Sequence, residues 1–390
     1  MPIRKQVDVR PDWKTKAHDI GFTWHTDDKG VTYWVDDAYW AFSTREIDEI
    51  EVATELCYGL VLDAVDTVIA DRALLEKFGY NDAAIRLIRH SWDTRGHNPT
   101  VDNTFYTRFD FAYENGVPKL LEVNGDTPTS LLEGAAMQWF WMEDRFANAD
   151  QFNSIHDGLV GYFTKLHNSG VSHAHVCCIS PHPEDEGTVS YVEEVMRQGG
   201  MDTSFIALDR IGLRSDGYFV DESERVITHM FKLVPTEWML ESDFGTALVD
   251  AIITGKLTLM EPAWKMVASN KMLLETLYQQ NPNNPHILRA STSEHDLSGY
   301  AKVKKPVLGR EGQNVTITDA YGGVVETNGG YYDDDQYIYQ QRTTLLNANG
   351  RHAVIGSWII DGEAAGMGIR ESANLITNNV SQFVPHVIEG

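Results

Sequence analysis

The amino-acid sequence predicts a mixed α+β and α/β fold with a helix-rich lobe, a small parallel α/β segment and a β-rich lobe. Three observations support this prediction. Most of the first hundred residues carry apolar side chains at helical spacing. Residues 172–208 read as strand, helix and strand, an order that gives a parallel pair of strands. The last third of the chain alternates short apolar runs with glycine-bearing turns, which is typical of antiparallel strands.

The helical part begins with a clear start signal. Ser43 is an expected N-cap with Glu46 three residues later, and apolar residues recur at helical spacing from there to Gly79. A second helix is expected over residues 129–149. We assign its aromatic stripe to the hydrophobic core.

In the parallel segment, strands are expected at residues 172–180 and 202–208, with a helix over 187–200 between them. The loop "PHPEDEG" follows the first strand, at the edge where ligands usually bind. Its acidic residues are either ligand contacts or a solvated turn. His173, His175 and Cys177 alternate on one face of the first strand, and a buried strand is favoured over a metal site there.

The stretch "RFDFAYENGVPKLLEVNGDTPTS" predicts a hairpin that turns at Asn115-Gly116. Glu122 and Asn124 point to the same face of the second strand, and the turn can bring Asp110 beside them. Two carboxylates and a carboxamide suit Mg²⁺, and the nearby Arg108 suits a transferring phosphoryl group. The alternative is an ordinary hairpin with a polar solvent face.

The stretch "KKPVLGREGQNV" predicts a strand, a turn and a second strand. Lys305 ends the first strand, and Gly309 and Gly312 allow the backbone to approach phosphate oxygens. The spacing matches neither of the common glycine-rich nucleotide motifs. Lys271 lies near the start of an expected helix, where a solvated lysine is the alternative interpretation.

Composition excludes several classes of protein. With 32 basic and 57 acidic residues the formal charge is −25, which disfavours a nucleic-acid partner. Three cysteines are too few for a disulfide framework in 390 residues. No apolar run reaches the length of a membrane span, so we expect a cytoplasmic protein without a membrane partner.

Six motifs, taken in order, resemble the synthetase module of the glutathionylspermidine synthase family, which has an ATP-grasp fold. They are "RFD" from Arg108, "LEVNGDTPTS" from Leu121, "EPAWKMVASNK" from Glu261, "KKPVLGREGQNV" from Lys304, "IYQQ" from Ile338 and "GIRESANLIT" from Gly368. The resemblance implies one module over residues 1–390, without the N-terminal amidase domain of some members. It is greatest to stand-alone bacterial members described as acid–amine ligases.

The resemblance also implies roles for individual residues. Arg108 would be catalytic, at the terminal phosphate, and Asp110, Glu122 and Asn124 would hold Mg²⁺. Thr127, Thr129, Asp185 and Glu186 would contact substrates. The residues implied in ATP binding are Arg108, Lys271, Lys305, Arg310, Glu311, Gly312, Gln340, Gln341, Arg370, Leu375, Ile376 and Thr377.

The implied activity is an ATP- and Mg²⁺-dependent ligation of a small-molecule acid to an amine through an acyl phosphate. The acid could be a glutathione-like peptide and the amine a polyamine. The alternatives are a nucleotide-binding protein without turnover and a small-molecule kinase. The chain departs from the family at Asn378 and Asn379, which replace a basic residue, at "FKLVPTEW" from Phe231 to Trp238, and near Val354, where a polar residue is replaced.

Overall fold

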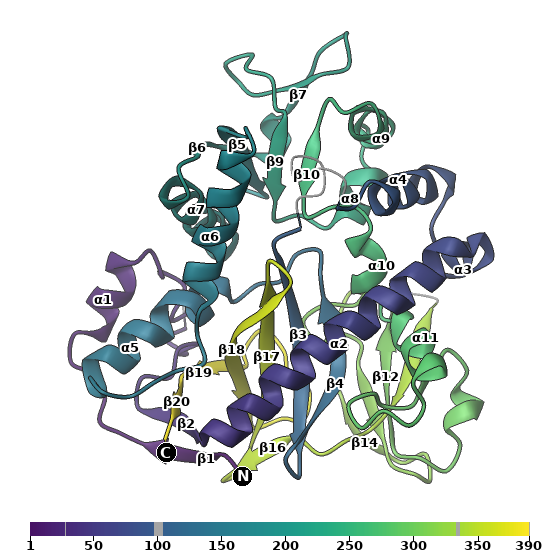
Figure 1. Ribbon diagram of the computed structural model, residues 1–390. Coiled ribbons are helices and arrows are strands. Elements are labelled where there is room, and N and C mark those ends of the chain that lie inside the picture. Colours follow the sequence, from purple (N-terminus) through teal and green to yellow (C-terminus); the bar gives the residue numbers. More distant parts are fainter. Residues whose placement is uncertain (28, 97–103, 333–335, 390) are drawn as a thin grey trace.

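The computed structural model describes residues 1–27, 29–96, 104–332 and 336–389. It is a mixed α and β molecule built around a central antiparallel sheet, with a parallel α/β segment at one end and a β-rich lobe beside it (Figure 1). The predicted fold class is confirmed at this level. None of the described helices combines the length and the apolar character that a membrane span needs.

The central sheet has strand order β19-β18-β17-β3-β4, and β16 pairs with β17. Its turns carry residues with positive φ at Asn115-Gly116, Asn349-Gly350 and Asp361-Gly362, as the sequence predicts. Its strands are β3 (Tyr106–Glu114), β4 (Val117–Asn124), β16 (Leu346–Ala348), β17 (Arg351–Ile360), β18 (Glu363–Ser372) and β19 (Gln382–Val384).

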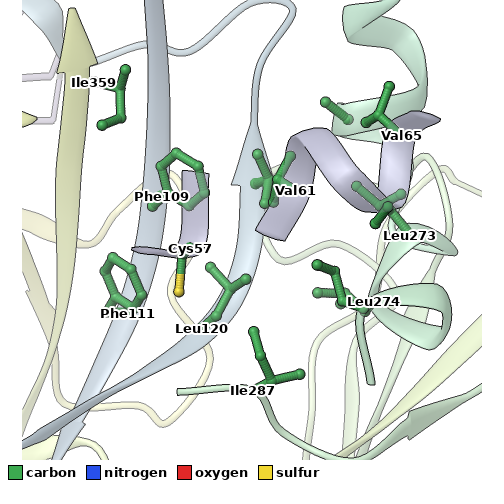
Figure 2. Close-up of a cluster of buried hydrophobic side chains, with 14 of the residues drawn as sticks. Cys57, Val61, Val65, Phe109, Phe111, Leu120, Leu273, Leu274, Ile287 and Ile359 are labelled. Carbon is green, nitrogen blue, oxygen red and sulfur yellow. The ribbon is translucent and has the colours of Figure 1, made fainter. Parts of the chain in front are cut away.

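Helix α2 (Thr44–Ala70) lies across this sheet. Its N-terminus has the predicted capping box between Ser43 and Glu46. Figure 2 shows Val61 and Val65 of α2 among side chains of the sheet and of α11. The other helices of this region are α3 (Arg72–Lys77), α4 (Asp82–Asp93), α10 (Lys265–Ser269) and α11 (Leu273–Gln280). The helices thus do not form a lobe of their own, because the apolar face of α2 is buried on the sheet.

The parallel segment is a four-stranded sheet of order β10-β9-β5-β6, with all neighbours parallel. This arrangement confirms the strand–helix–strand prediction. The prediction of a loop at the acidic residues is wrong, because residues 183–187 form the first turn of α7. Pro183 occupies the first helical turn, where its missing N–H costs nothing. The elements are β5 (His173–Cys178), β6 (Asp202–Ala207), β9 (His229–Lys232), β10 (Thr258–Met260), α6 (Ile155–Asn168), α7 (Pro183–Gln198), α8 (Thr236–Glu241) and α9 (Gly245–Ile253).

The β-rich lobe is an antiparallel sheet of order β11-β15-β12-β13-β14. Strands β12 and β13 flank the predicted glycine-bearing turn, so that strand–turn–strand prediction is confirmed. The strands are β11 (Ala290–Ser291), β12 (Lys302–Pro306), β13 (Thr316–Thr318), β14 (Val324–Thr327) and β15 (Tyr337–Gln341).

The two chain ends meet in a small sheet of order β1-β2-β20 (Figure 1). The helix predicted over residues 129–149 forms as a π-helical turn, Glu133–Met137, that continues into α5 (Gln138–Arg145). The remaining elements are β1 (Ile3–Gln6), α1 (Trp13–Asp19), β2 (Ala38–Phe42), β7 (Gly212–Leu213), β8 (Phe219–Val220), β20 (His386–Ile388) and two 3-10 helices, Leu208–Arg210 and Glu294–Leu297.

The core under α2 allows a matched test of this packing. Val61 is 2% exposed, whereas Val52, on the same helix, is 63% exposed. We expect Val61→Ala to lower the free energy of unfolding by about 1–3 kcal/mol and Val52→Ala to change it by less than about 0.5 kcal/mol. Both substitutions gain the same helix propensity, so their difference reports burial. Urea unfolding measures both, and equal midpoints would contradict the packing of α2 on the sheet.

Candidate active site

The β3–β4 hairpin sets the position of the two predicted metal-ligand carboxylates. Its register places Asp110 opposite Glu122 and Arg108 opposite Asn124. Directly opposed residues of an antiparallel pair have side chains on the same face. The predicted grouping of these four side chains is therefore confirmed as geometry.

Arg108 holds one of these carboxylates. Its Nε lies 2.7 Å from Oδ1 of Asp110, and its Nη2 lies 3.1 Å from Oδ2. The remaining nitrogen, Nη1, donates to the Thr129 carbonyl oxygen at 2.6 Å. These three hydrogen bonds fix the orientation of the Arg108 guanidinium plane.

Two lysines from other elements complete the charged cluster. Lys271, just before α11, has its Nζ 3.3 Å from Oε2 of Glu122 and 2.5 Å from the Gly309 carbonyl oxygen. Lys305, on β12, donates to the Leu121 carbonyl oxygen at 2.9 Å and to Oε1 of Gln340 at 2.8 Å. Both ammonium groups therefore line the space in front of the carboxylates.

The pKa values follow from this arrangement. Burial opposes ionisation of Glu122, but Lys271, Lys305 and Arg108 outweigh it and lower the pKa of Glu122 to about 2. Burial and the positive charge of Lys271 both disfavour the ammonium form of Lys305 and lower its pKa to about 8. The negative charges of Glu122 and Asp110 oppose this shift but do not cancel it. Burial also raises the pKa of Asp110, although the positive charge of Arg108 opposes this shift.

The donor set fits a magnesium ion. Among the described residues, no three His, Cys, Asp or Glu side chains form a metal site by themselves. A metal ion here would therefore be held by two carboxylates, Asp110 and Glu122, and by the carboxamide oxygen of Asn124. The Nδ2 of Asn124 is buried and has no hydrogen-bond partner among the described residues. Mg²⁺ typically binds a small number of protein oxygen atoms and completes its coordination with oxygen atoms of the substrate.

A cavity opens from these groups into the space between the central sheet and the β-rich lobe. Val303 and Ile317 form one apolar wall, and Val354 and Leu375 form part of the other. A flat aromatic base suits such a slot. The predicted residues that line it are Asp110, Glu122, Lys271, Lys305, Glu311, Gly312, Gln340, Gln341, Leu375, Ile376 and Thr377.

The glycine-bearing turn closes one side of this cavity. Glu311 and Gly312 both have positive φ, at 57° and 65°. A Cβ on Gly312 would lie 2.2 Å from the Thr377 carbonyl oxygen, so only glycine fits there. This explains why the turn carries glycine at a position where another chain segment approaches.

A second, more polar cavity shares Asp110, Glu122 and Lys271 with the first. Arg310 crosses it, since its Nη1 donates to Oγ1 of Thr127 at 2.7 Å and its Nη2 to Oε1 of Glu237 at 2.9 Å. The other predicted residues that line this cavity are Arg108, Asn124, Thr129, Glu311, Gly312, Arg370 and Thr377.

The sequence did not predict that Glu133 and Glu184 interact with each other and with Arg370. Glu133 is fully buried; its Oε1 accepts from Nε1 of Trp24, and its Oε2 has no partner among the described residues. Burial, then the charge of Glu133, raises the pKa of Glu184 to about 7. The available signal was a lone acid inside the apolar run "LLEGAAM", and the π-helical turn there is common at functional sites.

None of Glu184, Asp185 and Glu186 lines either of these two cavities. Glu186 instead accepts from Oγ of Ser180 at 2.5 Å and lines a separate groove between helices. Helical residues advance by about 100° each, so one turn cannot present Glu184 and Glu186 in the same direction. The substrate role of Asp185 and Glu186 stays a prediction.

A family model described as glutathionylspermidine synthase preATP-grasp matches residues 4–389. The chain is 36% identical over 393 residues, 97% of both chains, to a Haemophilus influenzae protein named "Putative acid–amine ligase". It is 29% identical to trypanothione synthetase of Crithidia fasciculata, over 83% of this chain and 52% of that one. The chain therefore belongs to the glutathionylspermidine synthase family of acid–amine ligases.

A solved structure supports the fold. A glutathione synthetase-like effector from Globodera pallida aligns over 97% of this chain and 96% of its own, with a TM-score of 0.57 and 10% identity. At that identity the likeness concerns the fold alone. The single-module organisation over residues 1–390 stays a prediction.

If Lys305 contacts a phosphate group, as the sequence predicts, its lowered pKa makes that contact sensitive to pH. Below about pH 8 its ammonium is charged and attracts phosphate oxygens; above that value the neutral amine does not. We expect the affinity for an ATP analogue to fall by about tenfold between about pH 7.5 and 9.5. Lys305→Arg keeps its charge over this range and should flatten the profile, as measured by titration calorimetry. An unchanged slope in Lys305→Met would show that another group titrates.

Proposed function

We propose that this chain is an ATP- and Mg²⁺-dependent ligase that joins a carboxylic acid to an amine through an acyl phosphate. The observation that supports it best is that Asp110, Glu122 and Lys271 line both cavities at once. One cavity has the apolar walls of a nucleotide slot, and the other has the polar groups of a substrate site. A phosphoryl group at their junction could pass from one ligand to the other.

In the first step, a carboxylate oxygen of the acid attacks the γ-phosphorus of ATP. The bond from that phosphorus to the bridging oxygen breaks, ADP leaves and an acyl phosphate forms. Arg108, Lys271 and Lys305 balance the charge on the transferring group. Mg²⁺ held by Asp110, Glu122 and Asn124 would supply further charge neutralisation. The chain contributes positioning and electrostatics and forms no covalent intermediate.

In the second step, the free amine attacks the acyl carbon, phosphate leaves and the amide forms with loss of a proton. Glu133 and Glu184 are the candidates for an amine subsite because both interact electrostatically with Arg370, which lines the polar cavity. A protonated amine would favour ionisation of Glu184. The names of the relatives point to a peptide acid and a polyamine as substrates.

The activity can be tested directly. Chain, Mg-ATP and pooled acids and amines are incubated, and new amides are sought by mass spectrometry. We expect an amide with equimolar ADP and phosphate, and we expect Glu122→Gln to lose this turnover while it keeps its fold by circular dichroism. A stable phosphorylated acid would identify a kinase instead, and nucleotide binding without ATP consumption would identify a protein without turnover.

The amine subsite gives a separate prediction. Because the pKa of Glu184 is about 7, its carboxylate forms as pH rises through neutrality, and KM for a cationic amine should fall over that range. Glu184→Gln should raise this KM by about tenfold, remove the pH dependence and leave KM for ATP unchanged. Glu186→Gln, two residues away, is the matched control. A larger effect of Glu186→Gln would support the sequence-based assignment and refute this one.

A further inference from the structure

The carboxyl edge of the parallel sheet carries an apolar groove of about 360 Å³. Residues that follow three of the parallel strands line it: Ile179 after β5, Leu208 after β6 and Val234 after β9. Trp238 and Phe244 line it as well. Ile179, Trp238 and Phe244 are 44%, 44% and 43% exposed, so three large apolar side chains remain open to solvent in one place.

This groove adjoins the polar cavity through helix α8. Glu237 lines the cavity, and the next residue, Trp238, lines the groove. The Trp238 ring lies 6.0 Å from the guanidinium carbon of Arg310, which is hydrogen-bonded to Thr127. The Nε of Arg310 is buried and has no partner among the described residues. Arg310 lines the cavity, so a ligand that contacts its guanidinium group from the cavity can extend past Trp238 into the groove.

We propose that the groove binds an apolar group of the acid substrate, which makes that substrate an acylated or peptide acid with a hydrocarbon or aromatic substituent. This inference rests on the proposed ligase function. The acid fits better than the amine because the groove adjoins the guanidinium group of Arg310 and, through it, the hydroxyl of Thr127 in the polar cavity.

The lining also argues against a strongly charged tail. Among the described residues, the groove is lined by no lysine or arginine, and Asp209 is its one charged group. A second carboxylate placed there would lose hydration without gaining a counterion. A hydrocarbon or aromatic ring would instead remove Ile179, Trp238 and Phe244 from water.

The test uses acids that share one carboxylate and differ in their apolar group. N-acetylglycine, N-butyrylglycine and N-benzoylglycine are titrated into the full chain with Mg²⁺ and a non-hydrolysable ATP analogue, and binding is measured by calorimetry. We expect N-benzoylglycine to bind about tenfold more tightly than N-acetylglycine. In the double variant Ile179→Asn with Phe244→Ser this advantage should disappear, while the affinity for N-acetylglycine stays the same.

Phe205→Ser is the matched control, because Phe205 is 45% exposed on β6 and does not line the groove. It should leave both affinities unchanged. Equal binding of all three acids would overturn the inference. An equal loss for N-acetylglycine and N-benzoylglycine in the double variant would also overturn it, since that pattern reports a general disturbance of the site.

The same acids separate this inference from the proposed function. Each is incubated with Mg-ATP and pooled amines, and amides are sought by mass spectrometry. Groove-dependent binding without any amide from any acid, including thiol peptides, would refute the ligase function but leave a binding site for apolar acids. Amide formation from polar acids alone, with no effect of the double variant on KM for the acid, would refute the groove and leave the ligase function intact.

Discussion

The compensation of two neighbouring carboxylates is the interaction on which the rest of the site depends. The β3–β4 register places Asp110 directly opposite Glu122, and two negative charges so close repel each other in a partly buried site. The chain brings Arg108, Lys271 and Lys305 from three elements to this point. The cavity with apolar walls, the glycine-bearing turn and the polar cavity are all arranged around that cluster.

A buried ion pair ties the cluster to the parallel segment. Asp126, just after β4, accepts from Nζ of Lys232 at 2.6 Å and from the backbone N–H of Thr236 at 2.8 Å. Both charged side chains are almost fully buried, so removing one partner would leave an uncompensated charge at a cost of about 3–5 kcal/mol. The pair therefore holds α8, with Glu237, at a fixed distance from the hairpin.

The parts of this site that the sequence predicts correctly are those set by local rules. Alternation along strands and the Asn115-Gly116 turn predict the hairpin, and glycines predict the turn around Gly312. The sequence reasoning failed at "PHPEDEG", where Pro183 and the acidic residues after it are also a helix-start signal. It also missed Glu133 and the groove, because both depend on contacts between segments far apart in the chain, which single-sequence patterns do not contain.

In the proposed function, the charged cluster would couple the binding of the metal to that of the nucleotide. Arg108 and Lys271 bond to the same carboxylate oxygens that suit a divalent cation. A cation that binds Asp110 and Glu122 competes with these side chains for those oxygens, and the displaced guanidinium and ammonium then require another anion. The phosphates of a nucleotide in the adjoining cavity would provide that anion. Each charge in the cluster thus has a partner both before and after ligands bind, which avoids the high cost of an unpaired charge in a buried site.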